Sequence, residues 1–86
     1  MGRTVPSYRQ ALEAEAEKWR KMARVLRPEH KQSLEQLIEA ARSLASAASY
    51  AALPSVADSM LLSALIKLQC EVNKLRRELE ELKSGR

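Results

Sequence analysis

The chain has 86 residues, of which 30% are charged, and a formal net charge of +4. That length predicts a single domain spanning residues 1–86, because domains under about 100 residues struggle to bury enough surface. The apolar share is 45%, yet 13 residues are Ala and none is Phe, so a lone monomer would have a thin core. No apolar stretch approaches the roughly 20 residues that cross a bilayer. We therefore expect a cytoplasmic protein with no membrane among its partners.

The charges are distributed unevenly along the chain. Residues 1–31 hold eight Lys or Arg against four Glu, residues 32–58 hold one Arg against three acids, and residues 59–86 hold six bases against four Glu. Both ends are therefore basic and the middle is acidic. This spread permits a polyanionic partner, but it falls short of the dense basic stripe that is typical of one.

The first predicted helix spans residues 7–27 and follows an extended arm, residues 1–6. Ser7 with Gln10 three residues later is a capping-box pattern, which marks a helix start. Pro28 ends the helix, because the residue before a proline is pushed out of the helical region. The apolar stripe expected to face the core consists of Tyr8, Leu12, Trp19, Met22 and Leu26.

The second predicted helix spans residues 28–52. Pro28 suits its first turn, and Leu53-Pro54 ends it. Apolar residues repeat at steps of three and four through its length, and Ala41, Ala45, Ala48 and Ala52 add a stripe of small side chains. A stripe of this kind lets a neighbouring helix approach closely.

The third predicted helix spans residues 55–83, beginning at Ser55 with Asp58 three residues later, and residues 84–86 form a frayed tail. The short connections leave no room for strands. The sequence thus predicts an all-α fold, in which a helical hairpin packs against a longer third helix.

A heptad pattern in the third helix indicates self-association. Its apolar residues are spaced 4, 3, 4, 3, 4, 3, which is the a/d seam of a coiled coil. Glu71 and Glu78 fall at g, while Arg76 and Lys83 fall at e. A parallel second copy would set Glu71 against Arg76 and Glu78 against Lys83, whereas an antiparallel copy would set like charges together. The predicted seam consists of Leu61, Leu65, Leu68, Val72, Leu75, Leu79 and Leu82.

The alternative is that this seam packs on the first two helices of the same chain. Against it, the apolar residues between Met60 and Ile66 cover more than one face of the helix. Leu75, Leu79 and Leu82 also extend beyond the expected reach of the first helix. We therefore predict a parallel homodimer that works as a non-enzymatic adaptor or scaffold, with a further protein as another partner.

The residue inventory disfavours an enzyme. The chain has one His, one Cys and one Asp, too few for a catalytic arrangement or a zinc site within one copy. Neither glycine belongs to a phosphate-binding loop. We predict no catalytic, cofactor-binding or metal-binding residues. His30 reads as a solvated residue, and Cys70, at the outer f position, as an ordinary surface thiol.

A basic run gives the alternative function, a nucleic-acid-binding dimer. Four bases recur at steps of 4, 3 and 4, so that one helix face could contact phosphates. The competing interpretation is a solubilising surface. The four candidates are Arg20, Arg24, Arg27 and Lys31.

Several segments resemble a family of short archaeal proteins of unknown function. They are the opening Met1-Gly2-Arg3-Thr4-Val5-Pro6-Ser7-Tyr8-Arg9, the Trp19 region leading to Arg24-Val25-Leu26-Arg27, the Ala-rich stretch through Tyr50, and Met60-Leu61-Leu62-Ser63. The resemblance covers most of the chain, and the opening is its most specific part. It implies an archaeal cytoplasm and no activity, ligand or site residue.

Overall fold

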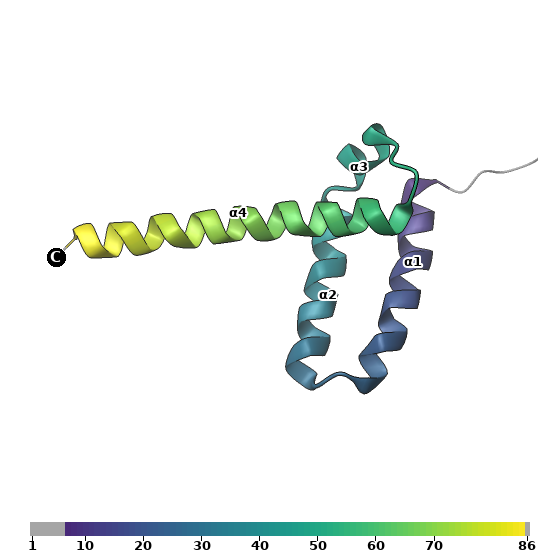
Figure 1. The fold of residues 1–86 in the computed structure, drawn as a ribbon, viewed down its shortest axis with the longest axis horizontal. Helices are drawn as coiled ribbons and strands as arrows, with labels where there is room; N and C mark the ends of the chain where they lie inside the picture. The colour runs from purple at the N-terminus through teal and green to yellow at the C-terminus, as the bar shows by residue number, and fades with distance from the viewer. Residues whose placement is uncertain (1–6, 86) are drawn as a thin grey trace, which may run out of the picture.

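The computed structural model describes residues 7–85, and these fold into helices without any strand (Figure 1). The predicted all-α class is therefore confirmed. The expected extended arm, residues 1–6, and Arg86 lie outside the described residues. The elements in chain order are α1 (Tyr8–Met22), the 3₁₀ turn η1 (Ala23–Val25), α2 (Pro28–Ser43), α3 (Ala45–Ala51) and α4 (Val56–Ser84).

The helices form an elongated molecule with extents of 67 × 33 × 15 Å. Figure 1 shows α1 and α2 side by side as a hairpin, with α4 lying across the end where the hairpin opens. The first part of α4 packs on α1, α2 and α3. Its remainder projects beyond the hairpin and ends far from the other helices (Figure 1).

Three predicted helix starts are present, two of them with side-chain caps and one with a proline in the first turn. Ser7 and Gln10 form a capping box, in which each side chain accepts a hydrogen bond from the other residue's backbone N–H. Pro28 occupies the first turn of α2, where its missing N–H costs nothing. The Ser55 side chain accepts a hydrogen bond from the backbone N–H of Asp58 at the start of α4.

The first helix is shorter than predicted. We expected it over residues 7–27, but α1 ends at Met22 and the chain tightens into η1. Leu26 and Arg27 then adopt extended backbone conformations, as the ring of the following Pro28 favours. The core-facing stripe ends earlier too, since Met22 is 62% exposed.

The second helix is divided where we expected it to run unbroken over residues 28–52. Leu44 leaves the helical region (φ −109°, ψ 19°), although no Pro or Gly lies nearby. The break redirects α3 so that Ala45 and Ala48 are buried, and tertiary packing here overrides the strong helix propensity of an Ala-rich segment. Ala52, with a left-handed φ of 52°, ends α3.

The core is small and is built largely from small side chains. Its six buried members come from all four α-helices, and Tyr8, Trp19, Leu34 and Val56 pack around them. Ala41, Ala45 and Ala48 of the predicted alanine stripe are buried, whereas Ala52 is exposed. The alanines allow close helix approach. The buried cluster consists of Leu12, Ala16, Ile38, Ala41, Ala45 and Met60.

Two arginines cross-link α1 and α2. Arg42 donates through Nε and Nη2 to both carboxylate oxygens of Glu13, at 2.5 and 2.9 Å. Arg20 donates in the same way to Glu35, at 2.8 and 3.0 Å. These hydrogen bonds hold the pKa of each carboxyl below its ordinary 4.5. The planar guanidinium fork therefore fixes the pairing of the two helices.

The contribution of the core contact can be measured with a matched pair of variants. Met60→Ala should lower the free energy of unfolding by about 2–4 kcal/mol, because it leaves a cavity between α4 and the hairpin. Ile66→Ala on the exposed side of α4 should cost less than about 1 kcal/mol. Urea unfolding followed by circular dichroism compares them. Equal losses would show that Met60 does not anchor α4.

The cross-links predict a specific pH dependence. Because the pKa values of Glu13 and Glu35 are lowered in the folded state, the stability that they supply is present above pH 4.5 and disappears as the pH falls through those lowered values. A Glu13→Gln/Glu35→Gln variant should melt about 3–6 °C below the wild type at neutral pH. This difference in melting temperature should shrink as the pH falls through the lowered pKa values of the two carboxyls.

Glu80→Gln/Glu81→Gln is the control, since neither carboxylate forms an ion pair among residues 7–85. It should melt with the wild type at every pH. If the difference in melting temperature between wild type and Glu13→Gln/Glu35→Gln persisted undiminished in acid, it would contradict the assigned role of the two bridges.

Candidate interaction surfaces

Helix α4 presents two different faces at its start. Ser59, Met60, Ser63 and Ala64 are buried against the rest of the chain. Successive helical residues are rotated by about 100°, so Leu61 lies well round the helix from Met60, and it is 51% exposed. The hairpin thus covers one side of α4 and leaves the adjacent side open.

The open side is a continuous apolar ridge, which we call the α4 ridge. It consists of all seven residues of the predicted seam, whose exposure ranges from 39% at Val72 to 71% at Leu82. None of them packs into the buried core. Leu62 and Ile66, exposed by 50% and 47%, widen the apolar surface at its beginning.

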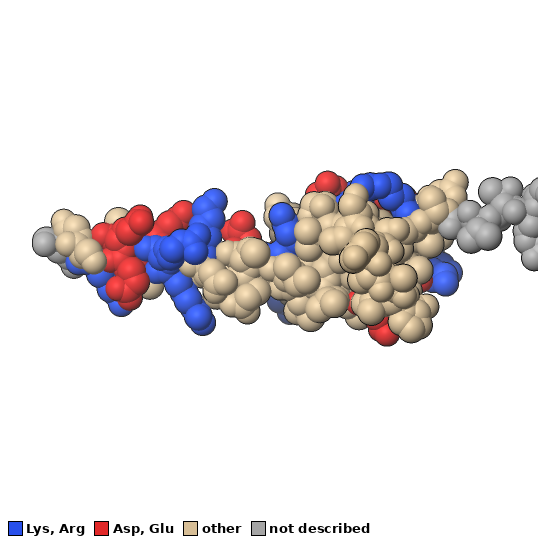
Figure 2. All heavy atoms as spheres, turned by 90° about the horizontal axis from the view of Figure 1, so that it is seen from above, with Lys and Arg blue, Asp and Glu red and all other residues tan. Residues whose placement is uncertain are grey.

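Charged residues border the α4 ridge on both sides. Glu71 and Glu78 lie at g positions, and Arg76 and Lys83 lie at e positions; all four are exposed. Figure 2 shows acidic and basic side chains alternating along the projecting part of α4, while the view over α3 is dominated by uncharged residues. The projecting part therefore combines an apolar ridge with charges of both signs.

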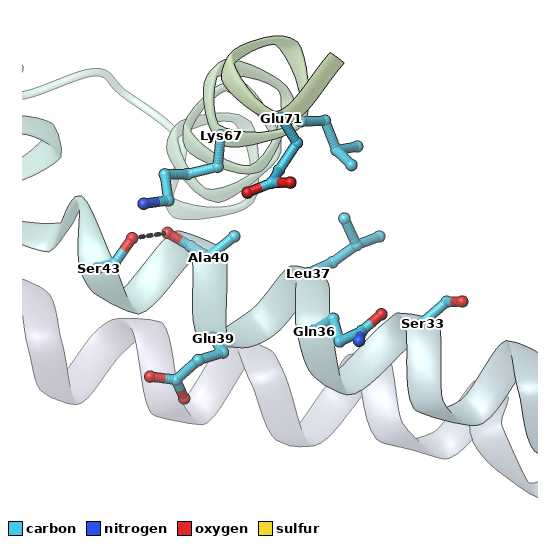
Figure 3. A pocket seen from close by; sticks show the side chains of 9 residues that line it. Ser33, Gln36, Leu37, Glu39, Ala40, Ser43, Lys67 and Glu71 are labelled. Atoms are coloured by element: carbon cyan, nitrogen blue, oxygen red, sulfur yellow. Dashed lines mark hydrogen bonds between the residues drawn. The ribbon is translucent and has the colours of Figure 1, made fainter. Parts of the chain in front are cut away.

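An open groove of about 710 Å³ lies in the angle between α2 and α4. In Figure 3, Lys67 and Glu71 point from α4 toward Ala40 and Leu37 of α2. The Ser43 hydroxyl donates to the Ala40 carbonyl oxygen at 2.7 Å. The groove marks the point where α4 separates from the hairpin, and Leu68 of the α4 ridge forms part of its wall.

The four candidate phosphate-binding bases do not form one surface. Arg20 is half-buried in the hairpin flank, where Glu35 and Glu17 both accept hydrogen bonds from it. Arg24, Arg27 and Lys31 are exposed around the turn between α1 and α2. The nucleic-acid alternative thus retains three of its four expected residues. The spacing of 4, 3 and 4 that grouped the four bases extends to Arg27 and Lys31, but α1 ends at Met22.

The other reactive side chains are isolated from one another. His30 and Cys70 are both exposed. Across residues 7–85, no group of three or more His, Cys, Asp or Glu side chains is arranged to hold a metal ion. Within the same range, no helix combines the length and apolarity needed to cross a membrane.

Sequence reasoning missed one further surface. Met22 was expected to face the core, but it is 62% exposed, and Val25, for which no role was predicted, is 85% exposed at the turn of the hairpin. The alternation of basic and apolar residues from Lys21 to Arg27 is the signal that could have identified it.

Comparison with known proteins places the chain in a family. No curated protein and no solved structure matches it significantly. One family model, described as "Domain of unknown function (DUF8156)", matches residues 1–85. Because that match spans nearly the whole chain, the protein belongs to the DUF8156 family of domains of unknown function.

Proposed function

We propose that this protein is a small homodimeric adaptor whose two copies associate in parallel through the α4 ridge. The observation that supports it is the exposure of seven large apolar side chains in an unbroken a/d pattern. Contiguous apolar surface of this kind on a soluble domain is typical of an interaction site. A second copy of the same helix supplies a surface of the same period and length.

The free energy of burial is of the right size for a dimer. About half of each ridge side chain is exposed. Covering these halves on both copies contributes on the order of 10–20 kcal/mol, and association costs about 4–15 kcal/mol. The balance favours a dimer that dissociates at low concentration rather than a permanent one.

The bordering charges select the parallel orientation. In a parallel pair, Glu71 faces Arg76 of the partner subunit and Glu78 faces Lys83 of the partner subunit, twice over by symmetry. In an antiparallel pair, g residues face g residues and e residues face e residues, so like charges meet. Each exposed pair contributes only about 0.2–1 kcal/mol, so the charges determine orientation more than affinity.

The position of the hairpin is compatible with this pairing. The hairpin covers the Met60 side of α4 and leaves the Leu61 side open, so a second α4 would lie on the uncovered side of the helix and would border the α2–α4 groove at Leu68. The dimer would then be a central two-helix rod with one hairpin on each copy. Such an arrangement suits a protein that holds two partners together.

Replacing two ridge leucines with acids should dissociate the dimer. Leu75→Asp/Leu79→Asp places charges inside the interface, where burial disfavours them, so the mass by light scattering should fall to that of one chain. Both residues are exposed and neither belongs to the buried core, so the helical circular dichroism of the hairpin should persist. Asn73→Asp/Ser84→Asp adds the same charge outside the seam and should leave the mass unchanged. An unchanged mass for the leucine variant would rule out this interface.

Charge reversal tests the orientation. Glu71→Lys/Glu78→Lys puts base against base in a parallel dimer and should weaken association about tenfold or more. Adding Arg76→Glu/Lys83→Glu to the same chain restores opposite pairs and should restore the affinity. In an antiparallel dimer the first variant would exchange one like-charge pair for another. Equal dissociation constants for wild type and Glu71→Lys/Glu78→Lys, by sedimentation equilibrium, would therefore exclude the parallel orientation.

A further inference from the structure

The turn that joins α1 and α2 is a strongly basic surface, which we call the hairpin tip. It spans residues 21–31 and lies at the end of the hairpin farthest from α4 (Figure 1). It carries four exposed cations and one acid, Glu29. None of the four forms an ion pair with another residue of the range 7–85. The cations are Lys21, Arg24, Arg27 and Lys31.

Helix stability does not account for this cluster. Lys21 is in the last turn of α1, where a cation complements the helix dipole. Arg27, by contrast, is the N-cap of α2 and makes no side-chain capping hydrogen bond. Lys31 follows within the start of the same helix. A positive charge at a helix N-terminus opposes the dipole, so these two side chains lie where the fold disfavours them.

The cations of the hairpin tip alternate with exposed apolar side chains. Met22 and Val25 are 62% and 85% exposed, and in sequence each is flanked by bases within two residues. Neither contributes to the buried core. The hairpin tip therefore presents exposed apolar groups and positive charges at the same end of the hairpin.

We propose that the hairpin tip docks on an anionic lipid surface. Met22 and Val25 enter the boundary between headgroups and acyl chains, while the four cations remain at the level of the lipid phosphates. Duplex nucleic acid would engage the cations alone, because its phosphate backbone offers the two apolar side chains nothing to bury against. The combination of the two kinds of group favours the lipid surface.

This proposal replaces our sequence-based expectation that no membrane is a partner. That expectation rested on the absence of apolar stretches long enough to span a bilayer. Docking at the interface needs no spanning segment, because it depends on a few apolar side chains and nearby cations.

Vesicle sedimentation provides the test. The full-length protein is mixed with vesicles of phosphatidylcholine alone, or of phosphatidylcholine with phosphatidylglycerol, across a salt series. Wild type should bind only the anionic vesicles, and more weakly as salt rises. Arg24→Gln/Arg27→Gln/Lys31→Gln should lower the partition coefficient by about a hundredfold. Met22→Ser/Val25→Ser, which keeps every charge, should lower it by about tenfold.

The control removes three cations from α4 instead. Lys67→Gln/Lys74→Gln/Arg77→Gln changes the net charge by the same amount, and all three side chains are exposed outside the a/d seam. It should bind vesicles like the wild type. Two results would overturn the proposal: no binding of anionic vesicles by wild type at low salt, or equal binding by wild type and Met22→Ser/Val25→Ser. Tight, salt-dependent binding of duplex DNA or RNA that ignores the apolar variant would assign the hairpin tip to nucleic acid instead.

A second consequence rests on the proposed dimer. The two-fold axis of a parallel pair runs along α4, so hairpins lying across that helix point in opposite directions in the two copies. The dimer should therefore cluster anionic vesicles, which turbidity detects. Leu75→Asp/Leu79→Asp should bind vesicles without clustering them. Binding without clustering by wild type would contradict the dimer alone, whereas a dimer that binds no vesicles would contradict the docking proposal alone.

Discussion

Close packing of the first turns of α4 against an alanine-rich hairpin determines the shape of this protein. Met60 and Ala64 are buried together with two serines, Ser59 and Ser63, where α4 packs on α1, α2 and α3. Small side chains on both surfaces let the helices approach closely. The hairpin holds only this short part of α4, and everything beyond the groove at Lys67 and Glu71 projects into solvent. The exposed α4 ridge is a direct consequence of how short that contact is.

Ion pairs within the hairpin likewise determine which charged side chains a partner could contact. Arg20 and Arg42 are engaged by carboxylates on both helices of the hairpin, so they hold the fold together and are not available to a partner. The apolar α4 ridge with its mixed charges and the basic hairpin tip remain accessible to partners. They lie at opposite ends of the α1–α2 hairpin, so a partner at one would not obstruct the other (Figure 1).

Local sequence signals predicted much of this structure. The caps at Ser7 and Ser55 and the proline at residue 28 located three helix starts, because side-chain capping and a fixed φ act within a few residues. The pattern in α4 also indicated apolar residues on more than one face between Met60 and Ile66, and the structure covers the Met60 side and exposes Leu61. These features depend on residues that are close together in the sequence, so a single sequence is enough to predict them.

What could not be predicted depends on contacts between distant residues. The break at Leu44 has no Pro or Gly to mark it, and it follows from burial of Ala45 and Ala48 against other helices. The bridges from Arg42 to Glu13 and from Arg20 to Glu35 span 29 and 15 residues, so helical spacing within one element gives no sign of them. The exposure of Met22 likewise required knowing where α1 ends.

The central claim is that a second copy covers the α4 ridge. The most direct measurement is the mass of the wild-type protein in solution, by light scattering over a concentration series. A dimer of this kind should show twice the chain mass of 9.7 kDa at high concentration, falling toward the single-chain value on dilution. A mass of 9.7 kDa at every concentration would contradict it.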